Sequence, residues 1–182
     1  MLPTDTVYGL CGSPHVEEVA GELYRLKQRP AGQPLALLAK DVEALLELVP
    51  ELPRAALEEL LPGAYTLVLP NPAQRFRRLT GSAPETIGVR VPKLTGPAAE
   101  VLEQVTAVVA TSANLHGGPE ARTLDDVPAE IRAGAGAVVD GGELPGTPST
   151  VLDLTGDEPR VLREGVVSEE EALERAEAAF GR

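Results

Sequence analysis

The sequence predicts an α/β or α+β domain built around one large sheet. Short runs rich in β-branched and aliphatic residues alternate along the chain with stretches of helical periodicity. No internal repeat, low-complexity tract or linker interrupts this alternation. A chain of 182 residues suits a single domain, which would bury roughly 70% of its unfolded surface. We therefore expect one domain over residues 1–182.

The chain begins with a short strand and the first helix. The segment Pro3–Leu10 combines apolar residues with two threonine hydroxyls, a carboxylate and a phenol, and a Gly-Ser-Pro turn follows it. A helix is expected from Val16 to about Gln28, because apolar residues recur on one helical face at Val16, Val19, Ala20 and Leu23. Lys27 continues this face, so we expect its stem to pack on the core while its ammonium emerges at the helix end.

Proline, glycine and a capping residue delimit the next elements. Pro30 and Gly32 end the first helix, and an apolar strand follows at Pro34–Ala39. The helix Asp41–Val49 is capped by its first residue. The helix Pro53–Leu61 is closed by a Pro-Gly pair.

The middle of the chain predicts two strands, a helix and a third strand. Tyr65–Leu69 is nearly all apolar, which favours an internal position in the sheet, and Thr86–Val91 is a second strand. The helix Thr95–Gln104 tolerates a proline in its first turn. The β-rich run Ala107–Thr111 follows it.

The last third of the chain predicts a weak helix around Leu124–Arg132. Strands are then expected at Ala137–Asp140, Thr150–Leu154 and Arg160–Leu162. The final helix begins with a capping box formed by Ser168 and Glu171. It is expected to bury Leu173, Ala176 and Phe180.

The composition indicates a globular protein of a reducing compartment. Apolar residues make up 43% of the chain and charged residues 24%, and Cys11 is the single cysteine, which excludes an internal disulfide. No apolar run approaches the roughly 20 residues that span a bilayer, and no signal peptide precedes Pro3. We expect a cytoplasmic protein without a membrane partner.

The charge is distributed unevenly. The net charge of −12 argues against nonspecific nucleic-acid binding by the whole molecule. Residues 1–93 carry ten Lys and Arg against eleven Asp and Glu, whereas residues 94–182 carry six against seventeen. Within the first half, cations concentrate in Arg25–Arg29 and Arg75–Lys93. These two islands could hold an anion, although a solvated face is an equally simple interpretation.

Four loop clusters carry candidate chemistry. Thr4–Tyr8 is either a ligand site or a polar-faced strand. Lys27–Leu35 ends a helix with two cations, which suits a phosphate but equally a helix cap. Ser112–Asn114 ends a buried strand, where sheet folds place ligands, although an Asx turn would also explain it. Pro148–Val151, followed by Arg163–Gly165, is the fourth cluster. Hydroxyls facing cations across a cleft suit a ligand that bears phosphate or carboxylate groups.

Seven motifs in order resemble the YrdC-like family of threonylcarbamoyl-AMP synthases over essentially the whole chain. They are PTDTVYGL at 3–10, K-x-R-P at 27–30, P-G-x-x-T at 62–66, G-V-R-V-P at 88–92, S-A-N at 112–114, P-S-T-V at 148–151 and L-R-x-G at 162–165. The resemblance implies a twisted, open mixed sheet with flanking helices and a concave cleft.

The resemblance also implies an activity. The family are nucleotidyltransferases that condense L-threonine, bicarbonate and ATP into threonylcarbamoyl-AMP and pyrophosphate. The product feeds downstream proteins that make the t6A modification at adenosine 37 of tRNA. Such chemistry needs positioning and cations rather than a side-chain nucleophile. The absence of a Ser-His-Asp or Cys-His signature is therefore expected.

Carried over position by position, the resemblance implies that Thr4, Arg90 and Ser149 bind threonine. The nucleotide-binding residues would be Lys27, Arg29, Thr86, Ser112, Asn114 and Arg163. Among these, the two cations after the first helix would act electrostatically on the phosphates. Mg²⁺ would arrive with the triphosphate, and Asp5 is the candidate to touch it.

The chain departs from the family pattern at several points. Relatives usually have about twenty residues before the PTDT segment, so the resemblance implies that a helix and a strand start are missing and that Thr4 lies near a terminus that would fray. Gln33 stands where relatives often have His or Asn, which puts its threonine contact in question. Glu120 stands near the position of an expected nucleotide-binding serine. We also expect a short form, without the fused C-terminal domain of longer relatives.

Two other functions stay open. One is a module that binds double-stranded RNA or tRNA weakly, with the cations of residues 75–93 lining a local groove. The other is a paralogue with different ATP or carbamoyl chemistry, which Gln33 and Glu120 leave room for. The intact K-x-R and S-x-N motifs favour the synthase.

Overall fold

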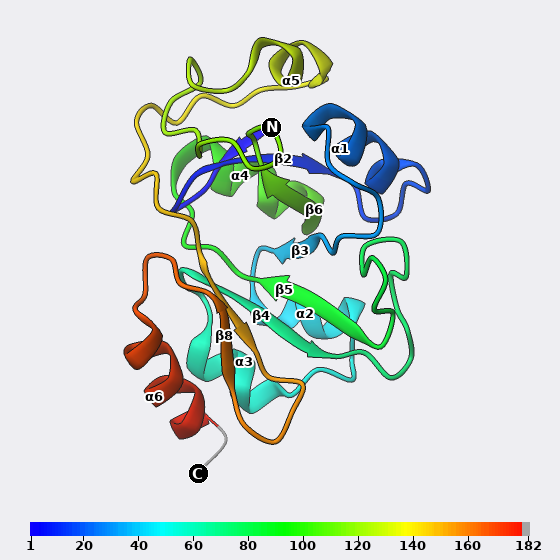
Figure 1. Cartoon of the computed structure of the whole chain (residues 1–182), viewed down its shortest axis with the longest axis vertical. Coiled ribbons are helices and arrows are strands. Elements are labelled where there is room, and N and C mark those ends of the chain that lie inside the picture. The colour runs from blue at the N-terminus through cyan, green and yellow to red at the C-terminus, as the bar shows by residue number, and fades with distance from the viewer. Residues whose placement is uncertain (180–182) are drawn as a thin grey trace.

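A computed structural model describes residues 1–179 of the chain, which form eight strands and six helices (Figure 1). The strands are β1 Leu2–Pro3, β2 Tyr8–Gly12, β3 Ala36–Ala39, β4 Tyr65–Pro70, β5 Thr86–Arg90, β6 Ala107–Ser112, β7 Thr150–Asp153 and β8 Arg160–Arg163. The helices are α1 Val19–Lys27, α2 Val42–Leu48, α3 Arg54–Leu60, α4 Gly96–Val105, α5 Ala129–Gly134 and α6 Glu169–Ala179.

All eight strands form one open mixed sheet in the order β1-β2-β6-β3-β5-β4-β7-β8. The pairs β3–β5 and β4–β7 are parallel, and the other five pairs are antiparallel. The sheet twists along its length, so that β2 and β6 cross the view in Figure 1 while β7 and β8 run nearly upright. The predicted fold class, a twisted open mixed sheet with flanking helices, is confirmed.

Side chains alternate between two environments along the central strands. In β4, Tyr65, Leu67 and Leu69 are buried, whereas Thr66 and Val68 are only partly buried and line a cavity. β5 alternates in the same way. Because successive side chains of a strand point to opposite faces, one face of the sheet forms a hydrophobic core and the other forms the cavity floor.

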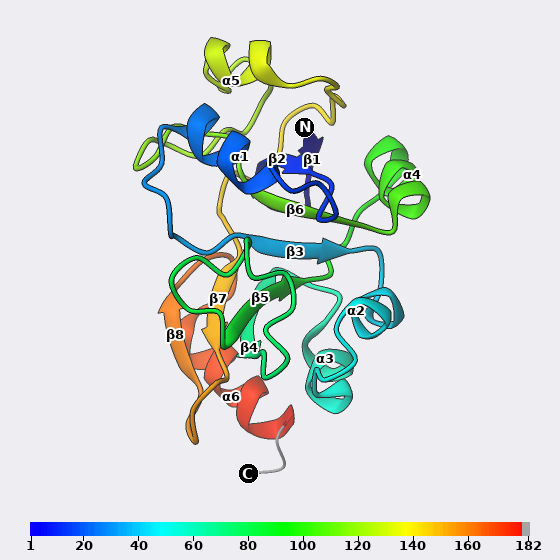
Figure 2. The same ribbon diagram turned by 90° about the vertical axis from the view of Figure 1, so that its right-hand side faces the viewer.

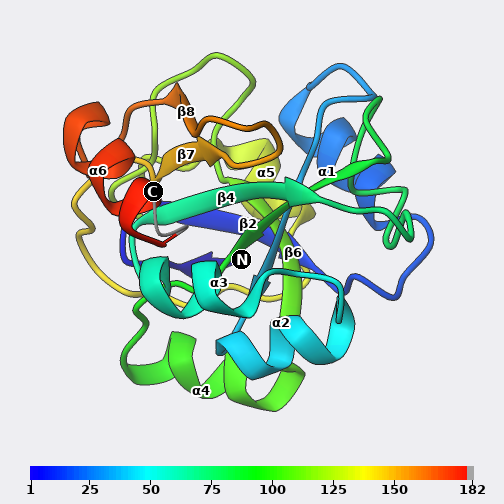
Figure 3. The same ribbon diagram turned by 90° about the horizontal axis from the view of Figure 1, so that it is seen from below.

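Helices cover the sheet in separate groups. α2, α3 and α6 pack with the core face of β3, β4, β5 and β7, and α2 and α3 lie together on one side of the sheet in Figure 2. α1 and the region of α5 pack on β2 and β6 in a second core. α4 covers the other pleat of β6 and β3 through Leu102, Val108 and Leu38. In the view from below in Figure 3, α2, α3 and α4 lie in the lower half of the picture and β7 and β8 in the upper half.

The prediction of a first strand is wrong for the middle of its range. Pro3–Leu10 is not one strand: β1 and β2 pair antiparallel, and residues 4–7 form the turn between them. The hydroxyl of Thr4 competes with the sheet for backbone groups. It accepts bonds from the amides of Thr6 and Val7 and donates to the Val7 carbonyl, at 3.2, 3.2 and 2.7 Å.

Two other predictions need correction. The first helix begins at Val19 rather than Val16, because residues 13–16 form a turn closed by the Val16 amide and the Ser13 carbonyl, and the Val16 side chain is half exposed. Residues 137–140 are not a strand. Their backbone pairs with Met1 alone among residues 1–179, through its terminal amine and its carbonyl, so no ladder forms.

The helical predictions hold in outline. Asp41 caps α2 by accepting from the Ala44 amide at 2.7 Å, and Ser168 accepts from the Glu171 amide at 3.3 Å at the start of α6. The weak helix is the short α5, which begins later than expected. In α6, Ala176 is buried and Leu173 is partly buried, and the prediction for Phe180 lies outside the described residues. Within residues 1–179 no helix combines the length and apolar character needed to cross a bilayer.

Candidate functional site

A cavity of about 490 Å³ lies on the open face of the sheet. Its floor comes from alternate residues of β3, β5, β4 and β7, and its walls come from the 4–7 turn, the loop after α1 and the ends of β6 and β8. Seven of the nine residues predicted to bind substrates line it: Thr4, Arg29, Thr86, Arg90, Ser112, Ser149 and Arg163. The other two, Lys27 and Asn114, lie behind its wall. These roles stay predictions, but the fold brings the residues together.

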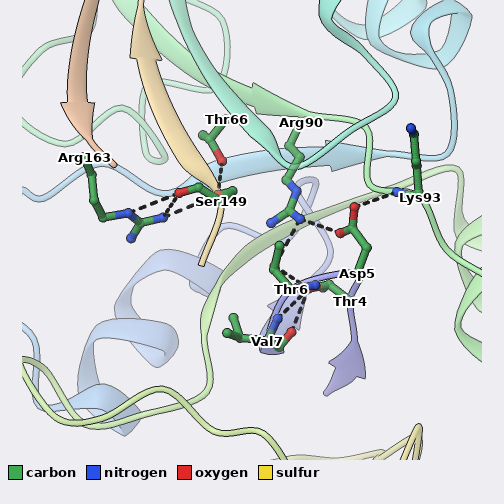
Figure 4. A network of polar contacts seen from close by, with 9 residues as sticks. All are labelled: Thr4, Asp5, Thr6, Val7, Thr66, Arg90, Lys93, Ser149 and Arg163. Atoms are coloured by element: carbon green, nitrogen blue, oxygen red, sulfur yellow. Dashed lines mark hydrogen bonds and ion pairs between the residues drawn. The ribbon is translucent and has the colours of Figure 1, made fainter. Parts of the chain in front are cut away.

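Arg90 ends β5 and holds the 4–7 turn against the cavity (Figure 4). Its Nη2 donates to Asp5 Oδ1 and to Thr6 Oγ1, the latter at 3.1 Å. The second Asp5 oxygen accepts from the Lys93 amide at 3.0 Å. Burial lowers the pKa of Arg90, and the Asp5 carboxylate opposes that change. The Arg90 Nε is buried and has no partner among the described residues, so this guanidinium keeps a free donor.

Ser149, before β7, joins two other elements at the cavity wall (Figure 4). Its hydroxyl lies 2.8 Å from Thr66 Oγ1 on β4. Arg163, at the end of β8, donates to the Ser149 carbonyl at 2.8 Å and to its hydroxyl at 3.3 Å. The sequence argument assigned no role to Thr66. Two features of the sequence point to it: Thr66 is the one aliphatic hydroxyl in a strand that is otherwise nearly all apolar, and it ends the P-G-x-x-T motif.

Arg29 enters the cavity from the loop after α1. Its Nε donates to Gln33 Oε1 at 2.6 Å, its Nη2 to the Pro34 carbonyl at 3.1 Å and its Nη1 to Thr111 Oγ1 at 3.4 Å. Burial lowers its pKa, and Tyr24 opposes the change. Among residues 1–179, neither Arg29 nor Arg163 has a carboxylate within ion-pair distance. Two cations without counter-ions in one cavity favour an anionic ligand.

Lys27 is placed differently from the prediction. Its ammonium does not emerge at the helix end but is buried, with the residue only 3% exposed. It donates to the Ser112 carbonyl, and to the carbonyl and side-chain oxygen of Asn114 at 2.7 and 2.8 Å. Burial lowers the pKa of Lys27 to about 8, opposed by the charge of Glu120. Lys27 therefore fixes the S-A-N turn from behind, and that turn presents Ser112 to the cavity.

Glu120 introduces a negative charge near these cations. Its charge raises the pKa values of both Lys27 and Arg163, although burial lowers both overall. One oxygen of the Glu120 carboxylate is buried without a hydrogen-bond partner among the described residues. An unpaired buried oxygen of this kind is costly, so the position differs physically from the serine that the resemblance implied.

Two cations of the second basic island, Arg75–Lys93, are engaged in surface ion pairs. Arg75 pairs with Glu51 at 2.7 Å and Arg78 pairs with Glu17 at 2.6 Å, both on the surface. Arg90 alone from this island lines the cavity.

The described residues offer little for a resident metal or a thiol reaction. No cluster of three or more His, Cys, Asp or Glu side chains occurs among residues 1–179. Both oxygens of Asp5 are already engaged, by Arg90 and by a backbone amide. Burial raises the pKa of Cys11 to about 11, which keeps the thiol protonated at neutral pH.

Comparison with known proteins identifies relatives over nearly the whole chain. The family profile Sua5_yciO_yrdC, described as "Telomere recombination", matches residues 1–165. The threonylcarbamoyl-AMP synthase of Bacillus subtilis is 33% identical over 175 residues, covering 93% of this chain and 50% of the relative. The uncharacterized protein YciO of Escherichia coli is 30% identical over 171 residues, covering 91% of this chain and 82% of the relative.

Solved structures agree with these relationships. The crystal structure of Pyrococcus abyssi Sua5 complexed with L-threonine matches with a TM-score of 0.82 at 34% identity, covering 98% of this chain and 52% of that protein. Escherichia coli YciO matches with a TM-score of 0.73 at 31% identity, covering 94% of this chain and 85% of that protein. The chain thus spans about half the length of the Bacillus subtilis synthase and of Pyrococcus abyssi Sua5, and most of the length of YciO.

Proposed function

The chain belongs to the Sua5/YciO/YrdC family, and from this premise we propose that it is an L-threonylcarbamoyladenylate synthase. It would condense L-threonine, bicarbonate and ATP into threonylcarbamoyl-AMP, pyrophosphate and water, and so supply the t6A modification of tRNA. The observation that carries the proposal is that one cavity is lined by Arg29, Arg90 and Arg163 together with Thr4, Ser112 and Ser149. A relative solved with L-threonine bound has the same fold.

The chemistry of the proposed reaction fits this lining. The threonine amine attacks bicarbonate, water leaves, and the carbamate that forms attacks the α-phosphorus of ATP while pyrophosphate departs. Bicarbonate, the carbamate, ATP and pyrophosphate are all anionic, so the enzyme must supply cations and fixed hydrogen-bond donors rather than a nucleophile. Each such donor stabilises a transition state by roughly 2–4 kcal/mol.

We assign the threonine to the Arg90 end of the cavity. Arg90, Thr4 and Ser149 line the same cavity, and the Arg90 guanidinium has a buried Nε without a partner among the described residues, which suits a carboxylate. The nucleotide phosphates are assigned to Arg29 and Arg163. Mg²⁺ would enter bound to the triphosphate, and Asp5 could offer it an oxygen only by releasing one of its present partners.

The test is a measurement of nucleotide turnover with substrates omitted in turn. The purified protein is incubated with ATP and Mg²⁺, and AMP and pyrophosphate are quantified with and without threonine and bicarbonate. We expect pyrophosphate release that requires both. An Arg90→Ala variant should lose it. Release of ADP and phosphate, or turnover independent of threonine, would contradict the synthase assignment.

A second candidate is a different ATP or carbamoyl reaction, carried out by a paralogue of the synthases. Glu120 is the observation that favours it, because its carboxylate lies near Lys27 and Arg163 and offsets charge that phosphates would otherwise use. A Glu120→Ser variant assayed in parallel separates the candidates. If Glu120 only weakens nucleotide binding, the variant should have a lower KM for ATP and the same products.

A further inference from the structure

Both oxygens of Gln33, in the side chain and in the main chain, accept hydrogen bonds from other residues of the protein. Its side-chain oxygen accepts from Arg29 Nε at 2.6 Å, and its main-chain carbonyl accepts from the Tyr24 hydroxyl at 2.7 Å. The neighbouring Pro34 and Leu35 line the cavity, and so does Arg29. Gln33 is not among the cavity-lining residues in the described part of the chain. It therefore contacts the site through Arg29.

The loop after α1 folds back on itself, so that Gln33 contacts Arg29. Gln28 ends the helix in the left-handed region at φ 51°, and the Arg29 amide bonds to the Tyr24 carbonyl at 2.9 Å. Gly32 then turns the chain with φ 87°, a conformation that glycine adopts without strain. This turn brings residue 33 beside the guanidinium four residues before it.

The bonds of Arg29 decide what it can offer a ligand. A guanidinium has five N–H groups in a rigid fork. Three are taken by Gln33, Pro34 and Thr111, which fixes the plane of the fork and leaves two for the cavity. The shortest of these bonds goes to an uncharged amide oxygen. A neutral partner orients the guanidinium without neutralising it, whereas a carboxylate at the same position would cancel its charge.

We propose that Gln33 is a positioning residue for the nucleotide: it holds the Arg29 fork toward the phosphates and does not contact the amino acid. The inference rests on the proposed function, in that the cavity binds ATP. It reassigns a position where the family resemblance would place a threonine contact.

The experiment measures the binding of ATP and of L-threonine separately by calorimetry, without turnover. Gln33→Leu removes the acceptor, and Gln33→Glu replaces it with a charge. Gln104→Glu, at an exposed position of α4, is the matched control for the added charge. We expect Gln33→Leu to weaken ATP binding about tenfold, or about 1.4 kcal/mol. Gln33→Glu should weaken it further, and the control should not change it. Threonine affinity and melting temperature should stay at wild-type values in all three.

A double-mutant comparison shows whether Gln33 acts through Arg29. In an Arg29→Ala background, Gln33→Leu should cause no further loss of ATP affinity, because the group it orients is gone. A loss that persists in this background overturns the inference. So does any fall in threonine affinity on Gln33→Leu, or ATP affinity that stays unchanged. A protein that binds ATP as expected but makes no threonylcarbamoyl-AMP would overturn the proposed function and leave this inference standing.

Discussion

At the scale of single residues, Arg90 performs two tasks with one guanidinium. Its Nη2 ties the 4–7 turn in place through Asp5 and Thr6, and the residue also lines the cavity, with a buried Nε that has no partner among the described residues. A lysine has three donors on one nitrogen and no planar fork, so it cannot serve both directions at once. The identity of the residue should matter here more than its charge.

We predict that Arg90→Lys weakens threonine binding by about 1.5–3 kcal/mol, the range for a hydrogen bond to a charged group, and leaves ATP binding nearly unchanged. Titration calorimetry with each ligand measures the two effects. Arg78→Lys is the control, since Arg78 pairs with Glu17 on the surface. An equal loss of ATP binding would mean that Arg90 serves the phosphates or the fold.

The buried ammonium of Lys27 leads to a prediction about how the free energy of unfolding depends on pH. Burial lowers its pKa from 10.5 to about 8 in the folded protein. Between these values the unfolded chain holds a proton on Lys27 that the folded chain has lost. The free energy of unfolding should therefore rise with pH across this window, and the contribution should be flat below about 8.

The measurement compares urea unfolding of the wild-type protein and a Lys27→Met variant from pH 7 to about 10.5. The wild-type curve should climb relative to the variant above pH 8. Taking the difference removes Cys11, whose raised pKa acts in the opposite direction. Parallel curves would show that the ammonium keeps its charge despite burial.

At the scale of elements, the segment that follows β8 packs closely against the backbone of the turn before β7. A Cβ added at Gly165 would lie 2.1 Å from the Pro148 carbonyl oxygen and 2.5 Å from the Ser149 carbonyl carbon. The Gly165 amide donates to the Thr150 hydroxyl at 3.0 Å, and the next amide donates to Pro148. The glycine of the L-R-x-G motif thus lets residues 163–167 pack against the turn that carries Ser149.

We predict that Gly165→Ala lowers the free energy of unfolding by about 1–3 kcal/mol through overpacking. Threonine affinity should fall with it, because the Ser149 turn is displaced. Gly21→Ala is the counterpart, since a Cβ at Gly21 meets nothing within 4 Å. In the α1 helix that change should stabilise by about 0.5–1 kcal/mol. Denaturant unfolding measures both, and a neutral Gly165→Ala would contradict the packing argument.

At the scale of the whole molecule, the cavity joins parts of the sheet that have separate cores. β2 and β6 belong to the core with α1 and α5, whereas β4 and β7 belong to the core with α2, α3 and α6. Residues from both parts line the cavity. A ligand that contacts both should stabilise the complete fold.

We therefore predict a melting-temperature increase on adding ATP and threonine. A ligand at a hundred times its Kd adds about 2.7 kcal/mol, which for a chain of this size corresponds to roughly 5–10 °C. Glycine in place of threonine is the control, since it lacks the side chain that the site would select. The absence of a shift at millimolar ligand would mean that the cavity does not bind these substrates.

The sequence by itself determined the elements and their order. Periodicity, proline and glycine located the six helices and all the strands except β1, with errors at the ends, and one predicted strand at 137–140 does not exist. These signals are local, since a helix or strand depends mostly on residues a few positions away. The same reading located the loop clusters that line the cavity, because polar residues follow buried strands at sheet ends.

Only the tertiary structure decided what each polar side chain bonds to. Lys27 meets residues 112 and 114, Arg90 meets Asp5, and Thr66 meets Ser149. Each of these pairs is separated by more than eighty positions in the chain. Such partners depend on the strand order, in which β6 lies between β2 and β3 and β4 lies between β5 and β7. A buried polar group must find a partner wherever the fold supplies one, and no local pattern in the sequence records which one it will be.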